Sequence, residues 1–201
     1  YPWSYKGAEH VFGAFKKLLG PTKAKVCLVV FEYGIDVNES KRLINELGIQ
    51  KNVIWFPITK RREILSMISF VDIGIGEIGN YSWISYGAIF EFMCMKRPII
   101  HHRNDAIYKG KVDNLYPMYC AVSEEELVKA LLDCYSDKNK ANAIANEAYD
   151  WYNKNAIDKP IEILTSLIQG KRPLIDKIKN SFSKFLLSVQ AIVFYIKLKF
   201  A

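Results

Sequence analysis

Apolar and polar positions along the chain follow two alternating periods, which predicts strands and helices in regular succession. Short apolar runs rich in Val, Ile and Leu predict buried strands at residues 25–31, 53–56, 72–75, 98–101 and 116–122. Apolar residues recurring every three or four positions predict helices at residues 8–19, 39–47, 61–70, 88–95, 139–155 and 160–169. Strands separated by helices favour an α/β fold with a doubly wound parallel sheet and a helical extension at the C-terminus.

Residues that end or cap helices support this division. Gly20-Pro21 ends the first predicted helix, and Asp36 or Asn38 can cap the second. Ser123 followed three residues later by Glu126 forms the pattern of a capping box, so a further helix is expected to begin there.

The segment from Ser85 to Ile100 carries the most chemical information. Ser85 can cap a helix, and the small residues Gly87 and Ala88 would let a ligand approach its first turn. The start of a helix offers free N–H groups and a positive dipole, which suit a phosphate. Glu91 lies one to two turns further along, where its carboxylate could reach a ribose hydroxyl.

This segment resembles the donor-binding segment of GT-B glycosyltransferases of the glycosyl transferases group 1, or family 4, type. The resemblance extends over about residues 5–169, through Tyr5-Lys6-Gly7, the helix–strand pair 43–56 and the Val71-Asp72-Ile73 strand. It implies a Rossmann-like, nucleotide-sugar-binding domain at residues 1–170, and the charge and apolar spacing of residues 171–201 predict a basic amphipathic helical tail after it. It also implies transfer of a sugar from a nucleoside-diphosphate sugar to a glycan or lipid-linked acceptor, with retention and without a metal or cofactor.

The chain begins with Tyr1 rather than Met, and we interpret it as the donor-binding half of a longer enzyme. A missing N-terminal domain would then hold the acceptor, so the fragment alone is expected to transfer nothing.

The resemblance assigns roles to several residues. Lys6 would neutralise the diphosphate, Glu91 would bind the ribose, and the backbone at Pro57 and Ile58 would hold the base. The full set of expected donor-binding residues is Lys6, Gly7, Gly34, Pro57, Ile58, Ser85, Tyr86, Gly87, Ala88 and Glu91. Two structural alternatives stay open: Lys6 is a solvated residue at a helix start, or Glu91 pairs with Lys96 or Arg97.

The chain departs from the family pattern at Trp83, eight residues before Glu91, where the family has a second Glu that contacts the transferred sugar. The nearest upstream acid is Glu77, which is therefore the candidate catalytic residue. Hydroxyl groups of Tyr81, Ser82 and Tyr86 are the other candidates for sugar contacts, unless this loop simply packs. Two other functions stay open: a non-catalytic nucleotide-binding or scaffold domain with a decayed donor site, and a GT-B-like nucleotide-sugar epimerase.

Other reactive residues favour structural roles. The four cysteines form no C-x-x-C pair, and Cys27 and Cys120 lie in apolar runs where we expect buried free thiols. The adjacent His101 and His102 cannot both face one metal from a regular strand, so no metal site is expected. The run Lys60-Arg61-Arg62 predicts a solvated helix start, with a phosphate clamp as the alternative.

The net charge of +7 belongs almost entirely to the tail. Residues 171–201 hold seven Lys or Arg residues and one acid, whereas the rest of the chain is nearly neutral, which argues against nucleic-acid binding. Apolar residues from Ile178 to Phe200 recur at helical spacing, but the apolar stretch is too short to span a membrane. We therefore expect a cytoplasmic protein whose tail lies on the anionic inner face of the membrane, or else packs on a protein partner.

Overall fold

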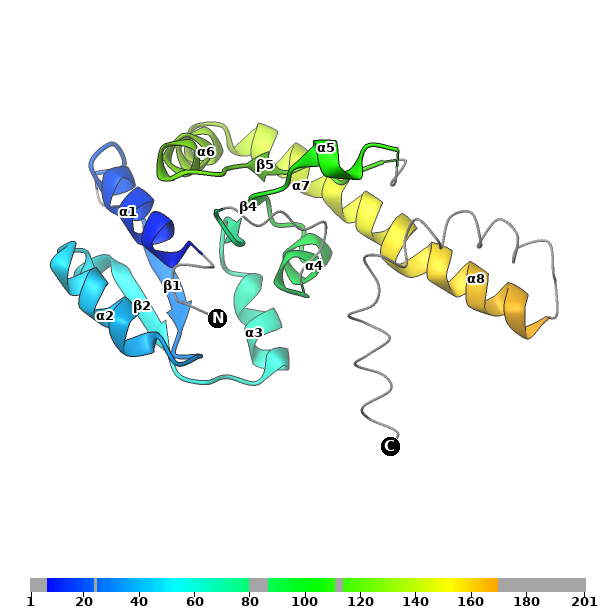
Figure 1. The fold of residues 1–201 in the computed structure, drawn as a ribbon, viewed down its shortest axis with the longest axis horizontal. Helices are drawn as coiled ribbons and strands as arrows, with labels where there is room; N and C mark the ends of the chain where they lie inside the picture. The colour runs from blue at the N-terminus through cyan, green and yellow to red at the C-terminus, as the bar shows by residue number, and fades with distance from the viewer. Residues whose placement is uncertain (1–6, 24, 80–86, 111–113, 170–201) are drawn as a thin grey trace. The chain divides into compact units, whose positions relative to one another are not determined.

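A computed structural model describes residues 7–23, 25–79, 87–110 and 114–169 of the 201-residue chain (Figure 1). The strands are β1 (Leu28–Phe31), β2 (Val53–Phe56), β3 (Gly74–Ile75), β4 (Ile99–His101) and β5 (Tyr119–Cys120). The helices are α1 (Ala8–Leu19), α2 (Val37–Glu46), α3 (Arg61–Ile68), α4 (Gly87–Cys94), α5 (Asp105–Tyr108), α6 (Glu124–Ser136), α7 (Lys138–Tyr152) and α8 (Lys159–Ile168). A 3-10 turn (Gln50–Asn52) precedes β2, and a π-helical segment (Asn153–Asp158) precedes α8.

The chain forms two compact units. Among the described residues, the first lies within residues 7–104 and 116–150, and the second within residues 105–115 and 151–169. The first unit contains the five strands and all the described residues that the sequence assigned to a donor site. The predicted boundary at residue 170 stays a prediction, because the tail lies outside the described residues.

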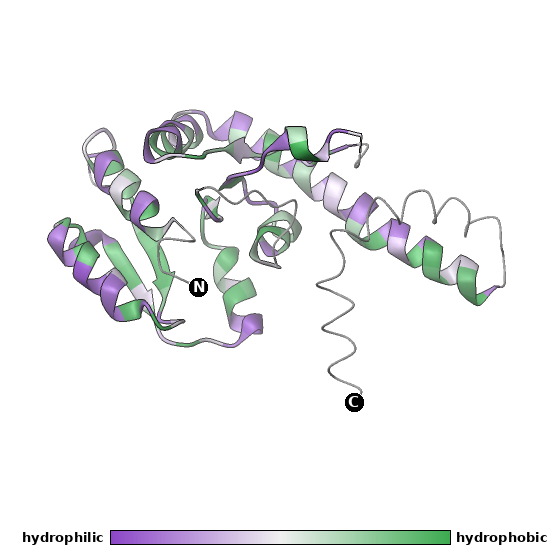
Figure 2. Cartoon of the chain, viewed as in Figure 1, coloured by the Kyte–Doolittle hydropathy of each residue, from purple (hydrophilic) through white to green (hydrophobic). Residues whose placement is uncertain are grey.

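Every strand pair in the described part of the chain is parallel, which confirms the predicted fold class. β1 pairs with β2, from Leu28 opposite Val53 to Phe31 opposite Phe56. β4 lies between β3 and β5 in a second ladder, so the five strands form two sheets. Figure 2 shows mostly hydrophobic residues along β1 and many hydrophilic residues on α2. Parallel strands place their carboxyl ends at one edge of a sheet, which is where ligands bind in such folds.

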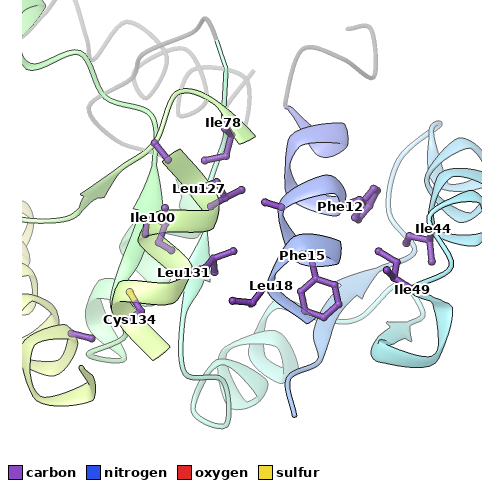
Figure 3. Close-up of a cluster of buried hydrophobic side chains, with 14 residues drawn as sticks. Phe12, Phe15, Leu18, Ile44, Ile49, Ile78, Ile100, Leu127, Leu131 and Cys134 are labelled. Carbon is purple, nitrogen blue, oxygen red and sulfur yellow. The ribbon is translucent and has the colours of Figure 1, made fainter. Parts of the chain in front are cut away.

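The hydrophobic core of this unit is built around α1. Phe12 and Phe15 of α1 point toward Ile44 and Ile49, and Leu18 lies on the side that faces α6 (Figure 3). Each of these five side chains is at most 5% exposed. Complete burial of a side chain of this size contributes about 1.5–3 kcal/mol to stability. The core therefore fixes the position of α1, which begins directly after Gly7.

The predicted start of α6 at Ser123 is confirmed, but the Glu126 carboxylate bonds the N–H of Val122 instead of that of Ser123. The Ser123 hydroxyl accepts from the Glu126 N–H at 3.3 Å, as a capping residue does. The Glu126 carboxylate accepts from the N–H of Val122 at 2.8 Å, one residue before the cap. These two bonds satisfy groups that would otherwise be unpaired at the helix start.

The prediction that Cys27 and Cys120 are buried is wrong, because both thiols are exposed. Hydrogen-bonded pairing of β1 begins only at Leu28, so Cys27 precedes the strand. Cys120 lies in β5, which has β4 as its one neighbour in the ladder. Among the four thiols, Cys134 on α6 is the buried one.

The second unit contains α5, the end of α7, the π-helical segment and α8. Apolar side chains at helical spacing are exposed along it, namely Ile157, Ile161, Leu164, Leu167 and Ile168. None of the helices described here is long and apolar enough to cross a bilayer.

Candidate functional site

The carboxyl ends of β1 and β2 open onto a pocket of about 240 Å³. The strands end side by side, and the N–H of Glu32 donates to the Phe56 carbonyl at 2.8 Å just beyond them. The pocket is lined by Phe31, Tyr33, Ile58, Thr59, Arg61 and Ile64. An apolar pocket with few polar groups at this edge is the usual form of a small-molecule site in a parallel α/β fold.

Two large apolar side chains at the mouth of this pocket are unusually exposed. Tyr33 is 82% exposed and Ile58 is 77% exposed. Each lies two residues after the end of its strand, where the chain turns toward α2 or α3. Flat or apolar ligand groups can pack against such side chains, since burying their surface is favourable.

The segment between β2 and α3 has a defined shape. The Thr59 hydroxyl donates to the Pro57 carbonyl at 2.6 Å, which holds the turn. The Lys60 N–H lies 3.4 Å from a carboxylate oxygen of Glu63. Lys60 is the capping residue directly before α3. Ile58 and Arg61 of this segment lie on the wall of the pocket.

Arg61 connects the pocket to α4. Its Nε atom lies 2.8 Å from Oε1 of Glu91, in an ion pair whose carboxylate side is 16% exposed and whose guanidinium side is 74% exposed. A largely desolvated carboxylate is costly unless it is paired, and this ion pair supplies a partner. The Nε atom of Arg61 is used in this ion pair, whereas its terminal nitrogens can still donate hydrogen bonds to other groups.

The alternative partners expected for Glu91 are wrong. Lys96 lies over the Tyr149 ring, 4.5 Å from its centroid, and Arg97 donates to the Ser69 carbonyl. The expectation that Lys60-Arg61-Arg62 is a solvated helix start is confirmed, because all three residues are exposed where α3 begins. Arg61 has in addition the ion pair with Glu91. The pairing of Arg61 with Glu91 had no signal in the local sequence, because the two residues are 30 positions apart.

Gly87 and Ala88 open α4, one turn before Glu91, as the sequence predicted within one residue. Both are exposed, and a Cβ atom built on Gly87 would meet no described atom within 4 Å. The first turn of α4 is therefore accessible from outside. Lys6, Ser85 and Tyr86, together with Trp83, lie outside the described residues.

Gly7 is held in close contact with the loop after β3. Its φ of 68° is in the left-handed region, and a Cβ atom there would lie 1.7 Å from the Ile78 carbonyl oxygen. Only glycine fits this position. The structure thus brings the start of α1 next to the residue that follows Glu77, the candidate catalytic acid, which is half-buried.

The predicted residues therefore divide into two groups within the first unit. Ile58 and Glu91 are linked through Arg61, and Gly7 meets the loop that carries Glu77. Gly34 lies at the tip of the turn after β1 with a φ of 106°, next to the pocket residue Tyr33. The sequence had singled out the turn but not Tyr33 itself, nor Thr59, whose positions on the pocket depend on the pairing of β1 with β2.

No protein-family model matches this sequence, and no match was found among curated proteins. Solved structures do match its fold. The C-terminal domain of the glycosyl transferase group 1 family protein LpcC from Francisella tularensis is 19% identical, with a TM-score of 0.62 over 77% of this chain and 82% of that one. Anabaena HepE in complex with UDP-glucose is 18% identical, with a TM-score of 0.62 over 81% of this chain.

TarM from S. aureus, in a complex that contains UDP, is 11% identical with a TM-score of 0.64. The chain spans 46% of the HepE chain and 33% of the TarM chain. These likenesses confirm that the chain has the Rossmann-like fold of a GT-B glycosyltransferase domain.

Proposed function

We propose that this chain, which has the fold of a GT-B glycosyltransferase domain, is the donor-binding half of an enzyme that transfers a sugar from a nucleoside-diphosphate sugar to an acceptor. The observation that carries the proposal is the Arg61–Glu91 ion pair, which joins the pocket after β1 and β2 to the first turns of α4. This arrangement suits an elongated ligand with an apolar flat end, hydroxyls in the middle and a phosphate group beyond them. HepE and TarM, which share the fold, have structures in complex with UDP.

The base of the nucleotide would lie against Tyr33 and Ile58, with the backbone at Pro57 and Ile58 available for hydrogen bonds. The Glu91 carboxylate would accept from the ribose hydroxyls, because a carboxylate has acceptor sites beyond the one that Arg61 uses. The diphosphate would lie at the start of α4, where free N–H groups attract an anion, with Lys6 and the turn at Ser85 and Tyr86 beside it.

The chemistry of transfer requires stabilisation of the negative charge that develops on the leaving diphosphate. Donors that are already in position achieve this at little reorganisation cost. The start of α4 and Lys6 would supply these donors, so the proposal needs no metal and no cofactor. We infer retention of configuration from the resemblance of the donor segment. The acceptor, a glycan or a lipid-linked alcohol, would be bound by a further domain, so this chain alone would not transfer sugar.

One specific observation favours a second candidate, a nucleotide-binding or scaffold domain without activity. Trp83 stands where a sugar-contacting Glu is expected, eight residues before Glu91. In the proposed enzyme Glu77 takes over this contact. In the second candidate the pocket and Glu91 still bind a nucleotide, but no sugar is transferred.

Chemical-shift mapping of a nucleoside diphosphate tests the proposal. The isotope-labelled chain is titrated with UDP and GDP, with inorganic phosphate as the control ligand. We expect one diphosphate to shift the amide signals of Ile58, Gly87, Ala88 and Glu91 together. Shifts that are absent with both nucleotides, or that fall elsewhere, would contradict the proposed site. Transfer by the longer enzyme then separates the two candidates.

A further inference from the structure

A buried polar cluster of His101, Arg103 and Tyr116 lies at the carboxyl end of β4. His101 and Tyr116 have no exposed surface, and Arg103 is 6% exposed. The Tyr116 hydroxyl lies 2.9 Å from His101 Nε2, and Arg103 donates to the Tyr116 carbonyl at 2.8 Å. The guanidinium of Arg103 also lies over the Tyr116 ring, with its central carbon 4.4 Å from the centroid. Buried polar groups of this kind are tolerated only when they are paired.

The hydrogen-bond partners fix the proton positions on His101. Its Nδ1 atom lies 3.0 Å from the His102 carbonyl oxygen, which can only accept, so Nδ1 carries the proton. When the ring is neutral, its Nε2 atom accepts from the Tyr116 hydroxyl. The His102 carbonyl therefore sets the tautomer of His101, and the Tyr116 hydroxyl holds the ring in a single orientation.

His102 binds the loop Gly76–Gly79 through two backbone carbonyls. Its N–H donates to the Glu77 carbonyl at 2.9 Å, and its Nδ1 atom donates to the Gly79 carbonyl. Gly76 donates to the Ile100 carbonyl at 2.8 Å, and a Cβ atom built on Gly76 would lie 2.8 Å from Cβ of His101. Residues at the end of β4 thus form hydrogen bonds with both the first and the last residue of the Gly76–Gly79 loop.

The other side of the loop contacts the start of α1. The Ile78 carbonyl lies against Gly7, and the Ile78 side chain is completely buried in the core. The loop that carries Glu77 is therefore held from two directions. It leads directly to residues 80–86 and then to α4.

We propose that His101, His102 and Tyr116 are positioning residues that hold the Gly76–Gly79 loop in the shape required for donor binding. The inference rests on the proposed function, because only then does the loop border the donor. Neither histidine touches the ligand. Tyr116 orients His101, whose Nδ1 bonds the His102 carbonyl, and His102 then bonds the carbonyls of Glu77 and Gly79.

The experiment compares His102→Leu with His102→Asn and Tyr116→Phe. Leu removes the side-chain donor to Gly79, whereas the Asn amide can restore it. Tyr116→Phe removes only the hydroxyl that orients His101, and Tyr135→Phe on the exposed face of α6 is the matched control. Amide hydrogen exchange of residues 74–79 reports on the loop without any ligand, and calorimetry reports UDP affinity.

We expect His102→Leu and Tyr116→Phe each to speed exchange in the loop and to weaken UDP binding by about fivefold, the size of one net hydrogen bond. His102→Asn and Tyr135→Phe should stay within about twofold of the unsubstituted chain. Unchanged hydrogen exchange of the loop in both His102→Leu and Tyr116→Phe would overturn the proposal that these side chains hold the loop. Faster exchange with unchanged UDP affinity would overturn the positioning role.

Failure of the unsubstituted chain to bind any nucleoside diphosphate would overturn the proposed function and, with it, the link of the loop to a donor. The exchange comparison would still decide whether the histidines hold the loop. A variant that does not fold is recognised by its loss of exchange protection in α1 and α6, and the Tyr116→Phe result then decides.

Discussion

The Nε atom of Arg61 lies 2.8 Å from Oε1 of Glu91 and joins the first residue of α3 to the first turns of α4. Arg61 also lines the pocket at the ends of β1 and β2. One side chain thus connects the region proposed for the base with the carboxylate proposed for the ribose. A role for Arg61 in orienting Glu91 follows from this contact.

Replacing Arg61 by Ala should weaken nucleoside diphosphate binding by about 1 kcal/mol, because Glu91 loses the hydrogen bond that orients its carboxylate. Arg62→Ala is the matched control, since Arg62 carries the same charge on the next residue of α3. Calorimetry of both variants separates a specific contact from general attraction. Equal losses in the two variants would mean that the ion pair itself does not matter.

A second prediction concerns Glu77 in the longer enzyme. If Glu77 replaces the acid that is missing at Trp83, Glu77→Gln should lower turnover far more than it weakens diphosphate binding. An interaction made with the sugar only in the transition state has this signature. Steady-state kinetics beside binding of the diphosphate measures the split, and small equal effects on both would remove Glu77 from the catalytic site.

The sequence predicted the fold well because the signals were local. Helix α1 has the predicted limits, and the start of α6 follows from Ser123, whose hydroxyl accepts the expected bond. Strand β2 has the predicted limits, whereas the other strands are shorter than predicted. Strand β5, for example, pairs over two residues although the apolar run is longer. Apolar runs report burial, whereas strand limits depend on where a neighbouring strand ends.

The candidate site was predictable only where its residues lie in one motif. Gly87, Ala88 and Glu91 could be identified because they are close together in sequence. The Arg61–Glu91 pair and the bonds from His102 to Glu77 and Gly79 join residues 23 or more positions apart. Such contacts depend on strand order and loop path, which periodicity does not specify.

A third prediction follows from the buried thiol of Cys134. Burial raises the pKa of Cys134 to about 11 and that of Tyr119 to about 12. Each group therefore holds its proton more tightly in the folded protein. The stability that Cys134 contributes is complete below the ordinary thiol pKa of about 8.5. That contribution is lost as the pH rises through about 11.

Urea unfolding at a series of pH values between about 8 and 11 measures this dependence. Stability should fall with rising pH in the unsubstituted chain and fall less steeply in Cys134→Ala. Cys27→Ala, at an exposed thiol, is the control and should keep the full slope. Identical slopes in all three proteins would contradict the assignment to Cys134.

A fourth prediction concerns the basic tail, which we propose holds the protein on an anionic membrane surface. Each Lys or Arg close to such a surface contributes about 1 kcal/mol, although all seven cannot face the lipid at once. Deletion of residues 173–201 should release the protein from vesicles containing phosphatidylserine and leave nucleotide binding intact. Salt should weaken the association, because exposed charges are screened beyond about 8–10 Å.

Neutral phosphatidylcholine vesicles are the control for this experiment. If the intact chain does not bind anionic vesicles, or if the deletion unfolds the protein, the tail is a packing helix and the membrane proposal fails.

Calorimetric titration of the intact chain and of Glu91→Ala with UDP and GDP tests the central claim most directly. We expect at least one diphosphate to bind, and Glu91→Ala to bind it more weakly by about 1–3 kcal/mol, the scale of a lost hydrogen bond to a charged group. Glu147→Ala, at an exposed acid on α7, should bind as the intact chain does. Binding that is unchanged in Glu91→Ala, or absent from the intact chain, would contradict the proposed donor site.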